Sequence, residues 1–331
     1  MTMKFATRLN SFGTRPELHW KDLVGKPTVV QLLDRASKVK GLTHVDLNFP
    51  NHMRDATPRE RAAQLADCGL KLNGFALRYY SEPQFKAGSF THPDPAIRQQ
   101  AIDIAKRGVD ALKECGGSIM TFWPGQDGFE YPFQSDYKRL WDLQLDGIRQ
   151  LAEHDATVTV SLEYKPDEPR AFSLLNNAGT TLLAIQQLGL PNLGMTLDYG
   201  HVLYAGEQPG CTVALVNKMS RLVGLHLNDA YGHRDDGMMV GSVHTLQTIE
   251  LLLQMERDGY KGVYYFDTFP DLTALDPVAE TETNIATVKA MMSVVRQLMA
   301  NPDLQAAQVA QDAIKTQRIV QRALFGAHYP D

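Results

Sequence analysis

Carboxylate and imidazole side chains stand at or directly after short apolar runs in the second half of the chain. Glu163, Asp198, His226 and Asp267 are four such positions. Because burying an unpaired charge is costly, an acid that closes an apolar run is more informative than an acid in a polar segment. Three acids that converge with one imidazole would repel one another, and a divalent ion would remove that repulsion. Oxygen ligands with one imidazole suit Mn²⁺, Mg²⁺ or Co²⁺ better than a structural zinc, which favours thiolates.

A polar loop with the sequence HRDD, residues 233–236, follows the run that carries His226. Its acids, Asp235 and Asp236, together with His201 and a bridging Asp198, are candidates to hold a second ion, since paired metals are a recurrent device for clamping oxygens. Adjacent residues of an extended loop diverge, however, and the arginine before them can neutralise either acid. These residues therefore predict one ion or two.

The elements that must position these side chains alternate regularly along the chain. Apolar runs rich in β-branched and aromatic residues predict eight strands, which begin at Lys4, Leu42, Lys71, Ser118, Thr157, Leu193, Leu222 and Gly262. The segments between them have apolar residues at helical spacing; residues 95–117 and 243–259 are the clearest. Strand–helix units of about 30 residues predict parallel strands with right-handed crossovers.

Eight such units favour a single closed (β/α)8 TIM barrel, with an open doubly wound sheet as the alternative. The first strand is followed by neither GxGxxG nor GxxxxGK[ST], which weakens the open, nucleotide-binding sheet. In such a barrel the carboxyl ends of the strands meet at one face, where active sites lie. The barrel is predicted to occupy residues 1–300 as one domain. Residues 301–331 form a predicted C-terminal helical extension, a single further helix outside the barrel that caps its bottom or embraces a partner subunit.

Composition excludes several classes of protein. The 331 residues carry a formal net charge of −5 and no strongly basic segment, so we expect no nucleic-acid partner. No apolar run approaches the roughly 20 residues of a membrane span, and the first residues lack the apolar core of a signal peptide. The scattered cysteines, Cys68, Cys115 and Cys211, predict core packing rather than disulfides. A cytoplasmic location fits these features.

Four segments, in order along the chain, resemble the xylose isomerase family of sugar isomerases and epimerases. LEYKPDEPR (residues 162–170) is similar to its E-P-K-P-N-E-P-R, PQFKAGSFT (83–91) to P-V-F-K-D-G-G-F-T, FWPGQDG (122–128) to W-G-G-R-E-G, and FDTFP (266–270) to F-D-F-K-P. The resemblance runs from about Lys71 to about Asp271. Rhamnose isomerases have aspartate and histidine at the positions of Asp198 and His226, and E-Y-K rather than E-P-K, so the metal ligands lean toward them.

The resemblance implies roles for individual residues. Glu163, Asp198, His226 and Asp267 would hold a structural ion, and His201 with the acids of residues 235–236 would hold a catalytic one. The resemblance also implies that Lys165 and His201 are catalytic. Lys165 would donate to the substrate oxygen at the first carbon. Substrate-binding roles fall to Trp123 and Phe85, which would wall the apolar face of the sugar, and to Asn48. No counterpart of the family's ring-opening histidine stands near Asn48 or His52.

The expected function is a metal-dependent aldose–ketose isomerase that uses one or two Mn²⁺, Mg²⁺ or Co²⁺ ions. The alternative is an epimerase or lyase on a keto-sugar, such as the catalytic subunit of a C-glycoside deglycosidase that acts on 3-oxo-glycosides, with His201 or Lys165 as base. A second metal site favours the isomerase, and a single ion favours the alternative. A homo-oligomer is expected, with a small second subunit as a further option. The net charge disfavours an apurinic-site endonuclease, and Lys165 would have no use in a non-catalytic sugar-binding protein.

Overall fold

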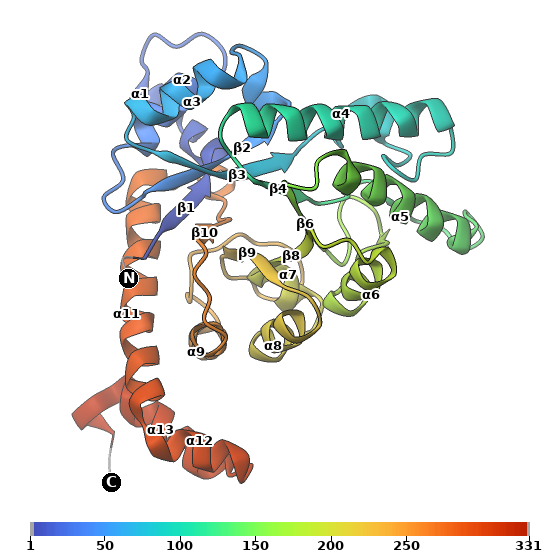
Figure 1. Ribbon diagram of the computed structural model, residues 1–331. Helices are drawn as coiled ribbons and strands as arrows, with labels where there is room; N and C mark the ends of the chain where they lie inside the picture. Colours follow the sequence, from blue (N-terminus) through green and yellow to red (C-terminus); the bar gives the residue numbers. More distant parts are fainter. Residues whose placement is uncertain (1–2, 330–331) are drawn as a thin grey trace.

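Eight parallel strands close into a barrel in this computed structural model, which describes residues 3–329. Around the barrel the strands follow the order β1-β10-β9-β8-β6-β4-β3-β2, so the chain passes once around the ring and the first strand pairs with the last. Figure 1 shows the helices outside the ring of strands. The predicted (β/α)8 barrel is therefore confirmed, and the open sheet is excluded. The barrel strands are β1 (Phe5–Arg8), β2 (His44–Phe49), β3 (Lys71–Leu77), β4 (Ile119–Phe122), β6 (Thr159–Glu163), β8 (Leu193–Asp198), β9 (Leu222–Leu227) and β10 (Tyr264–Phe266).

Each predicted apolar run contains one barrel strand. The first run, from Lys4, was expected to continue to Phe12. Instead β1 ends at Arg8 and a 3-10 helix, η1 (Leu9–Gly13), takes over. Polar residues at the ends of the strands, such as Arg8, Glu163 and Asp198, and in the loops that follow thus lie at the carboxyl face of the barrel.

The predicted helix over residues 95–117 is present as α4, and its ends have clear causes. Asp94 caps it by accepting a hydrogen bond from the Ala96 N–H at 2.8 Å, and Pro95 occupies the first turn. Gly116, with φ +79°, turns the chain after the last residue. The longer helices are α2 (Val29–Ala36), α3 (Pro58–Asp67), α4 (Pro95–Glu114), α5 (Tyr137–His154), α6 (Ala178–Leu188), α8 (Pro209–Met219), α9 (Thr245–Arg257) and α11 (Pro277–Ala300). Short helices are α1 (Pro16–His19), η2 (Asn51–Met53), η3 (Pro83–Phe85), α7 (Tyr199–Tyr204) and α10 (Pro270–Thr273).

A second, two-stranded sheet joins two loops above the barrel. Strands β5 (Gly128–Phe129) and β7 (Phe172–Ser173) pair antiparallel. The rings of Phe129 and Phe172 stack at 5.2 Å, and Arg170 binds both carboxylate oxygens of Glu130 at 2.8 Å. The loop after β4 and the loop after β6 are thereby fastened to each other at their tips.

The C-terminal extension contains two helices rather than the single one predicted over residues 303–326. Helix α12 (Pro302–Val309) and helix α13 (Ala313–Phe325) are separated at Gln311, whose φ of +54° is incompatible with a continuing helix. A short 3-10 turn, η4 (Gly326–His328), follows. The predicted single helix is therefore wrong, because the sequence keeps helical residue types across a break. Figure 1 shows both helices projecting beyond the end of α11. Within residues 3–329, no helix is both long and apolar enough to cross a membrane.

Candidate functional site

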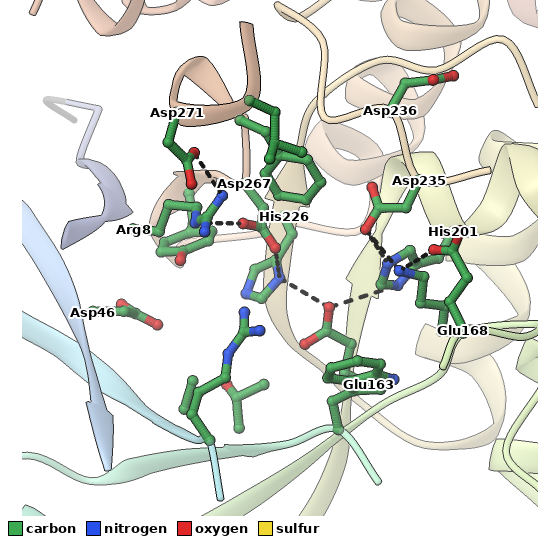
Figure 2. A pocket seen from close by; sticks show the side chains of 18 of the residues that line it. Arg8, Asp46, Glu163, Glu168, His201, His226, Asp235, Asp236, Asp267 and Asp271 are labelled. Atoms are coloured by element: carbon green, nitrogen blue, oxygen red, sulfur yellow. Dashed lines mark hydrogen bonds and ion pairs between the residues drawn. The ribbon is translucent and has the colours of Figure 1, made fainter. Parts of the chain in front are cut away.

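A pocket of about 610 Å³ opens at the carboxyl face of the barrel. All eight barrel strands, or the loops that follow them, contribute residues to its wall. Figure 2 shows acids, histidines and arginines facing one space. Among the residues predicted for the site, the lining includes Trp123, Glu163, Lys165, His201, His226, Asp235, Asp236 and Asp267. The position of the pocket agrees with the location of active sites in this architecture.

Strand register brings the four strand-end groups to one level. Parallel pairing sets Asp198 opposite His226, and Glu163 opposite Thr196, two residues before Asp198. Glu163 and Asp198 are the last residues of β6 and β8, and Asp267 directly follows β10. Because neighbouring strands end at nearly the same height, their side chains converge.

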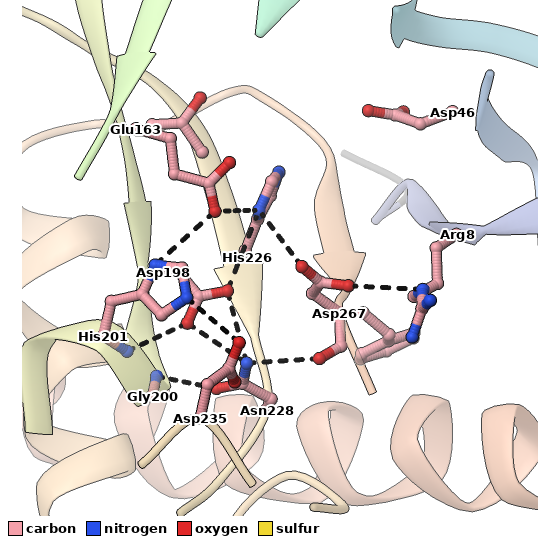
Figure 3. Close-up of polar contacts among 12 residues, drawn as sticks. Arg8, Asp46, Glu163, Asp198, Gly200, His201, His226, Asn228, Asp235 and Asp267 are labelled. Carbon is pink, nitrogen blue, oxygen red and sulfur yellow. Dashed lines mark hydrogen bonds and ion pairs between the residues drawn. The ribbon is translucent and has the colours of Figure 1, made fainter. Parts of the chain in front are cut away.

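These four groups could share one ion. One ligand atom each from Glu163, Asp198, His226 and Asp267 lies within 4.8 Å of the other three, and all four residues are buried. His226 Nδ1 lies 3.3 Å from Glu163 Oε1, 3.8 Å from Asp198 Oδ2 and 3.9 Å from Asp267 Oδ2 (Figure 3). We call this set the four-ligand group.

The charges of the four-ligand group perturb one another strongly. Burial alone would lower the pKa of His226, but the carboxylates of Glu163, Asp267 and Asp198 raise it to about 10. Burial raises the pKa of Asp198 to about 7. Three acids around one imidazole thus leave an excess of negative charge, which a divalent cation would offset.

A second set shares Asp198 with the first. Ligand atoms of Asp198, His201 and Asp235 also lie within 4.8 Å of one another. Asp198 is the N-cap of α7 and accepts a hydrogen bond from the His201 N–H at 3.0 Å, which fixes the acid and the histidine three residues apart on one side. His201 Nε2 lies 3.2 Å from Asp235 Oδ2. We call this set the three-ligand group.

Several ligand atoms lack hydrogen-bond partners, which tests whether the groups fit an ion. Among residues 3–329, no group makes a hydrogen bond to buried Asp235 Oδ1, and buried His201 Nδ1 has only Glu163 Oε1 nearby, at 3.6 Å, beyond hydrogen-bond distance. A buried polar atom left unpaired costs about 1–3 kcal/mol. Oxygen donors with one or two imidazoles suit Mn²⁺, Mg²⁺ or Co²⁺, so both groups fit a divalent cation.

Lys165 and Asp236 take different places around the three-ligand group. Lys165 Nζ lies 2.8 Å from Glu168 Oε2 and 3.1 Å from Asp235 Oδ2, so a buried ammonium faces one of the acids. Asp236 belongs to neither group, although the sequence placed it among the metal ligands. Its carboxylate accepts hydrogen bonds from the Tyr231 N–H at 2.9 Å and from Arg234 Nε at 2.7 Å. Figure 2 shows Asp235 and Asp236 pointing apart, as adjacent residues of an extended loop do.

The predicted substrate-binding residues fall in different surroundings. Trp123 lines the pocket, with its ring edge-on to Tyr80 at 4.6 Å. Phe85 lies outside the lining; it is fully buried, with its ring packed against Tyr79 at 5.2 Å. Asn48 also lies outside the lining, and its N–H donates to His52 Nδ1 at 3.0 Å. The pattern of residue types alone did not separate a pocket wall from the core behind it.

Several charged residues of the lining were not predicted, among them Arg8, Arg78 and Asp46. Arg8 binds Asp267 at 3.6 Å and Asp271 at 3.3 Å. Arg78 donates to the Tyr80 hydroxyl at 2.7 Å and lies 5.8 Å from the ring centre of Trp123. Asp46 is buried in β2, and burial raises its pKa to about 7. Arg8 ends β1 and Arg78 directly follows β3, as the predicted ligands end or follow the later strands.

A (β/α)8 barrel with acids and histidines at the carboxyl ends of its strands defines the class of this protein. Residues 33–291 match the model of the family described as the xylose isomerase-like TIM barrel. The chain belongs to this family, which confirms the resemblance seen in the sequence. The lean toward rhamnose isomerase stays a prediction.

Two curated relatives are xylose isomerases. The enzyme of Thermus thermophilus is 29% identical over 224 residues, which make up 66% of this chain and 58% of that enzyme. The enzyme of Thermus caldophilus is 28% identical over the same shares. The chain thus spans less than two thirds of the length of these curated relatives.

Solved structures with the same fold include sugar epimerases. An L-ribulose 3-epimerase superimposes with a TM-score of 0.68 at 16% identity, over 91% of this chain and 99% of its own. A D-tagatose 3-epimerase-like protein superimposes with a TM-score of 0.68 at 13% identity, over 90% of this chain and 100% of its own. The 3-keto-D-glucoside 4-epimerase of E. coli superimposes with a TM-score of 0.65 at 17% identity, over 87% of this chain and 99% of its own.

Proposed function

We propose that this protein is a divalent-metal-dependent sugar isomerase that interconverts an aldose and a ketose. The observation that carries the proposal is the pair of ligand groups that share Asp198, with Lys165 beside the second. The xylose isomerases among its relatives support the class of reaction. When bound, Mn²⁺, Mg²⁺ or Co²⁺ would supply Lewis-acid polarisation of sugar oxygens.

The chain's own residues orient the sugar and hold protons around it. Burial lowers the pKa of Lys165, but Asp235 and Glu168 reverse that effect and raise it, so the side chain stays an ammonium donor. In this proposal Lys165 donates to the substrate oxygen that gains negative charge, a stabilisation that counts most in the transition state. Trp123 covers the apolar face of the sugar. Arg78, which also lines the pocket, offers a further donor.

An epimerase or lyase on a keto-sugar is the second candidate, and a specific observation favours it. Asp235 belongs to the three-ligand group, but its Oδ2 already contacts Lys165 and His201. Asp236 points away from this group. A protein that loads the four-ligand group alone would hold one ion. In that case His201, buried beside the pocket, would serve as the base.

The test compares Asp235→Asn with Asp236→Asn, a matched change one residue away. Mn²⁺ stoichiometry is measured by calorimetry, and hydrogen transfer is followed with an aldose labelled at its second carbon. The isomerase predicts that Asp235→Asn loses one ion and the transfer, whereas Asp236→Asn keeps both. A wild-type stoichiometry of one ion, with turnover of keto-sugars or glycosides but not of aldoses, would replace the isomerase by the second candidate.

A further inference from the structure

A buried asparagine joins the ends of three neighbouring strands at the site. Asn228 directly follows β9 and is 0% exposed. Its Nδ2 donates to Asp198 Oδ1 at 3.1 Å, to Asp198 Oδ2 at 3.2 Å and to the Asp267 carbonyl at 3.2 Å. Its Oδ1 accepts a hydrogen bond from the Gly200 N–H at 2.7 Å. Figure 3 shows the amide in contact with Asp198 and with the Asp267 carbonyl.

These contacts fix which way the amide points. A flipped amide would set its oxygen against the Asp198 carboxylate and its NH2 against the Gly200 N–H, and both contacts would be repulsive. The observed arrangement supplies a neutral donor to a buried acid and adds no charge. It therefore constrains the carboxylate without competing with a cation for it.

The hydrogen bonds act unequally on the two oxygens of Asp198. Oδ1 receives Asn228 Nδ2 at 3.1 Å and also the His201 N–H at 3.0 Å, whereas Oδ2 receives Asn228 Nδ2 at 3.2 Å. Oδ2 is the oxygen that faces His226 Nδ1, at 3.8 Å. The plane of the carboxylate is thus set by these hydrogen bonds, and Oδ2 is presented to the four-ligand group.

We infer that Asn228 is a positioning residue: its amide holds the Asp198 carboxylate in the orientation that binds a divalent cation. The inference rests on the proposed metal dependence. Asn228 does not line the pocket, so it acts through Asp198 rather than on a substrate. Hydrogen-bond partners of metal-ligating carboxylates typically contribute about 10–100-fold in metal affinity.

The glycine opposite the amide supports this assignment. A Cβ at Gly200 would lie 2.9 Å from Asn228 Oδ1 and 3.3 Å from Asp198 Oδ1. Such contacts would displace the amide, the carboxylate or both. Gly200→Ala therefore perturbs the same contact from the other side, without removing any side chain.

The experiment measures Mn²⁺ affinity by calorimetry and the thermal unfolding of the metal-free protein, with full-length variants. Asn228→Ala is expected to weaken Mn²⁺ binding by about 10–100-fold, and Gly200→Ala to weaken it at least several-fold. Asn192→Ala is the matched control. Asn192 is a buried asparagine at the opposite end of β8, whose Nδ2 donates to the carbonyls of Ala152 and Val158 at 2.8 and 2.9 Å. It should lower the unfolding temperature as Asn228→Ala does and leave Mn²⁺ affinity unchanged.

The outcomes separate this inference from the proposed function. Wild-type protein that binds no Mn²⁺ refutes the metal dependence itself. Wild-type protein that binds Mn²⁺ and an Asn228→Ala variant that binds it equally well, with only its unfolding temperature lowered, would overturn the role of Asn228. If Asn228→Ala does not fold, Gly200→Ala decides: unchanged Mn²⁺ affinity rejects the inference, and weakened affinity upholds it.

Discussion

At the scale of single residues, Glu163 is the side chain on which both histidines depend. Its Oε1 lies 3.3 Å from His226 Nδ1 and 3.6 Å from His201 Nδ1, so one oxygen faces both ligand groups. Burial would raise the pKa of Glu163, but the two histidines hold it below its usual value. The residue is therefore ionised and available as a ligand.

Replacing Glu163 with glutamine keeps the shape of the side chain and removes its charge. We expect the affinity for Mn²⁺ to fall at least tenfold, because a buried charged ligand becomes neutral. Metal content after dialysis and calorimetric titration measure the change. Glu153→Gln, on the exposed face of α5, is the control and should match wild type. Full metal content in Glu163→Gln would show that the four-ligand group is not the metal site.

Arg78 differs from the other cations of the pocket. Arg8, Lys165 and Arg234 each lie within 4.0 Å of a carboxylate, whereas Arg78 contacts the hydroxyl and ring of Tyr80 and the ring of Trp123. Because no carboxylate of residues 3–329 pairs with it within 4.0 Å, we expect Arg78 to bind a substrate oxygen. Arg78→Gln should lower kcat/KM at least tenfold, since a charge-assisted hydrogen bond is lost. The Mn²⁺ stoichiometry should not change; a lost ion would instead make Arg78 part of the metal site.

At the scale of elements, the turn after β2 depends on a neutral histidine. His52 Nδ1 accepts the Asn48 N–H, so its Nε2 carries the proton that is shared with Asn10 Oδ1 at 2.7 Å. Burial, with the charge of Arg61 adding to it, lowers the pKa of His52 to about 4. A proton on Nδ1 would face the donor of Asn48, so protonation and this turn are incompatible.

This histidine makes stability depend on pH in a defined direction. Between pH 6.5 and 4, His52 takes up a proton in the unfolded chain but stays neutral in the folded protein. The free energy of unfolding is therefore highest above pH 6.5 and decreases as the pH falls through this range. A shift of this size corresponds to about 3 kcal/mol. Urea unfolding of wild type and His52→Gln across that range measures it, and the variant should lose less stability on acidification. His154→Asn, on the surface of α5, should follow wild type; equal slopes in all three proteins would contradict the role of His52.

The same scale shows what the sequence could predict. The strand runs and helix α4 were predictable because the spacing of apolar residues, the helix caps and the terminating glycines can all be recognised in short stretches of sequence. The four-ligand group was predictable because each acid or histidine ends a strand run, and the barrel brings the strand ends together. Phe85 and Asn48 could not be placed, because wall and core residues have the same types and differ only in what packs in front of them. The break at Gln311 is set by backbone conformation, which residue types there do not reveal.

At the scale of the whole molecule, the C-terminal extension is attached through few buried side chains. Leu304 of α12 is 2% exposed and packs into the apolar core, whereas Val309 at the end of the same helix is 82% exposed. Helix α13 contacts α11 and has no fully buried residue. The extension thus packs against α11, far along the chain from the ligand groups.

Leu304→Ala should destabilise the protein by about 2–4 kcal/mol, the usual cost of removing a buried leucine side chain. Val309→Ala removes a similar apolar group from an exposed position and should cost under about 0.5 kcal/mol. Chemical unfolding compares the two variants. Mn²⁺ affinity should stay at the wild-type value in both, and a loss of affinity in Leu304→Ala would show that the extension supports the site.

The small sheet of β5 and β7 has a consequence for how the rim of the pocket can change over evolution. Trp123 is the first residue of one of the joined loops and Lys165 the second residue of the other, and each loop is also anchored by its barrel strand. Each loop is held at its base by a barrel strand and at its tip by the other loop. We therefore expect that a change of length in one loop alone would disturb the Phe129–Phe172 stack or the Arg170–Glu130 pair. Insertions that diversify this rim are therefore expected in matched pairs, or in the other loops of the carboxyl face, where single insertions are tolerated.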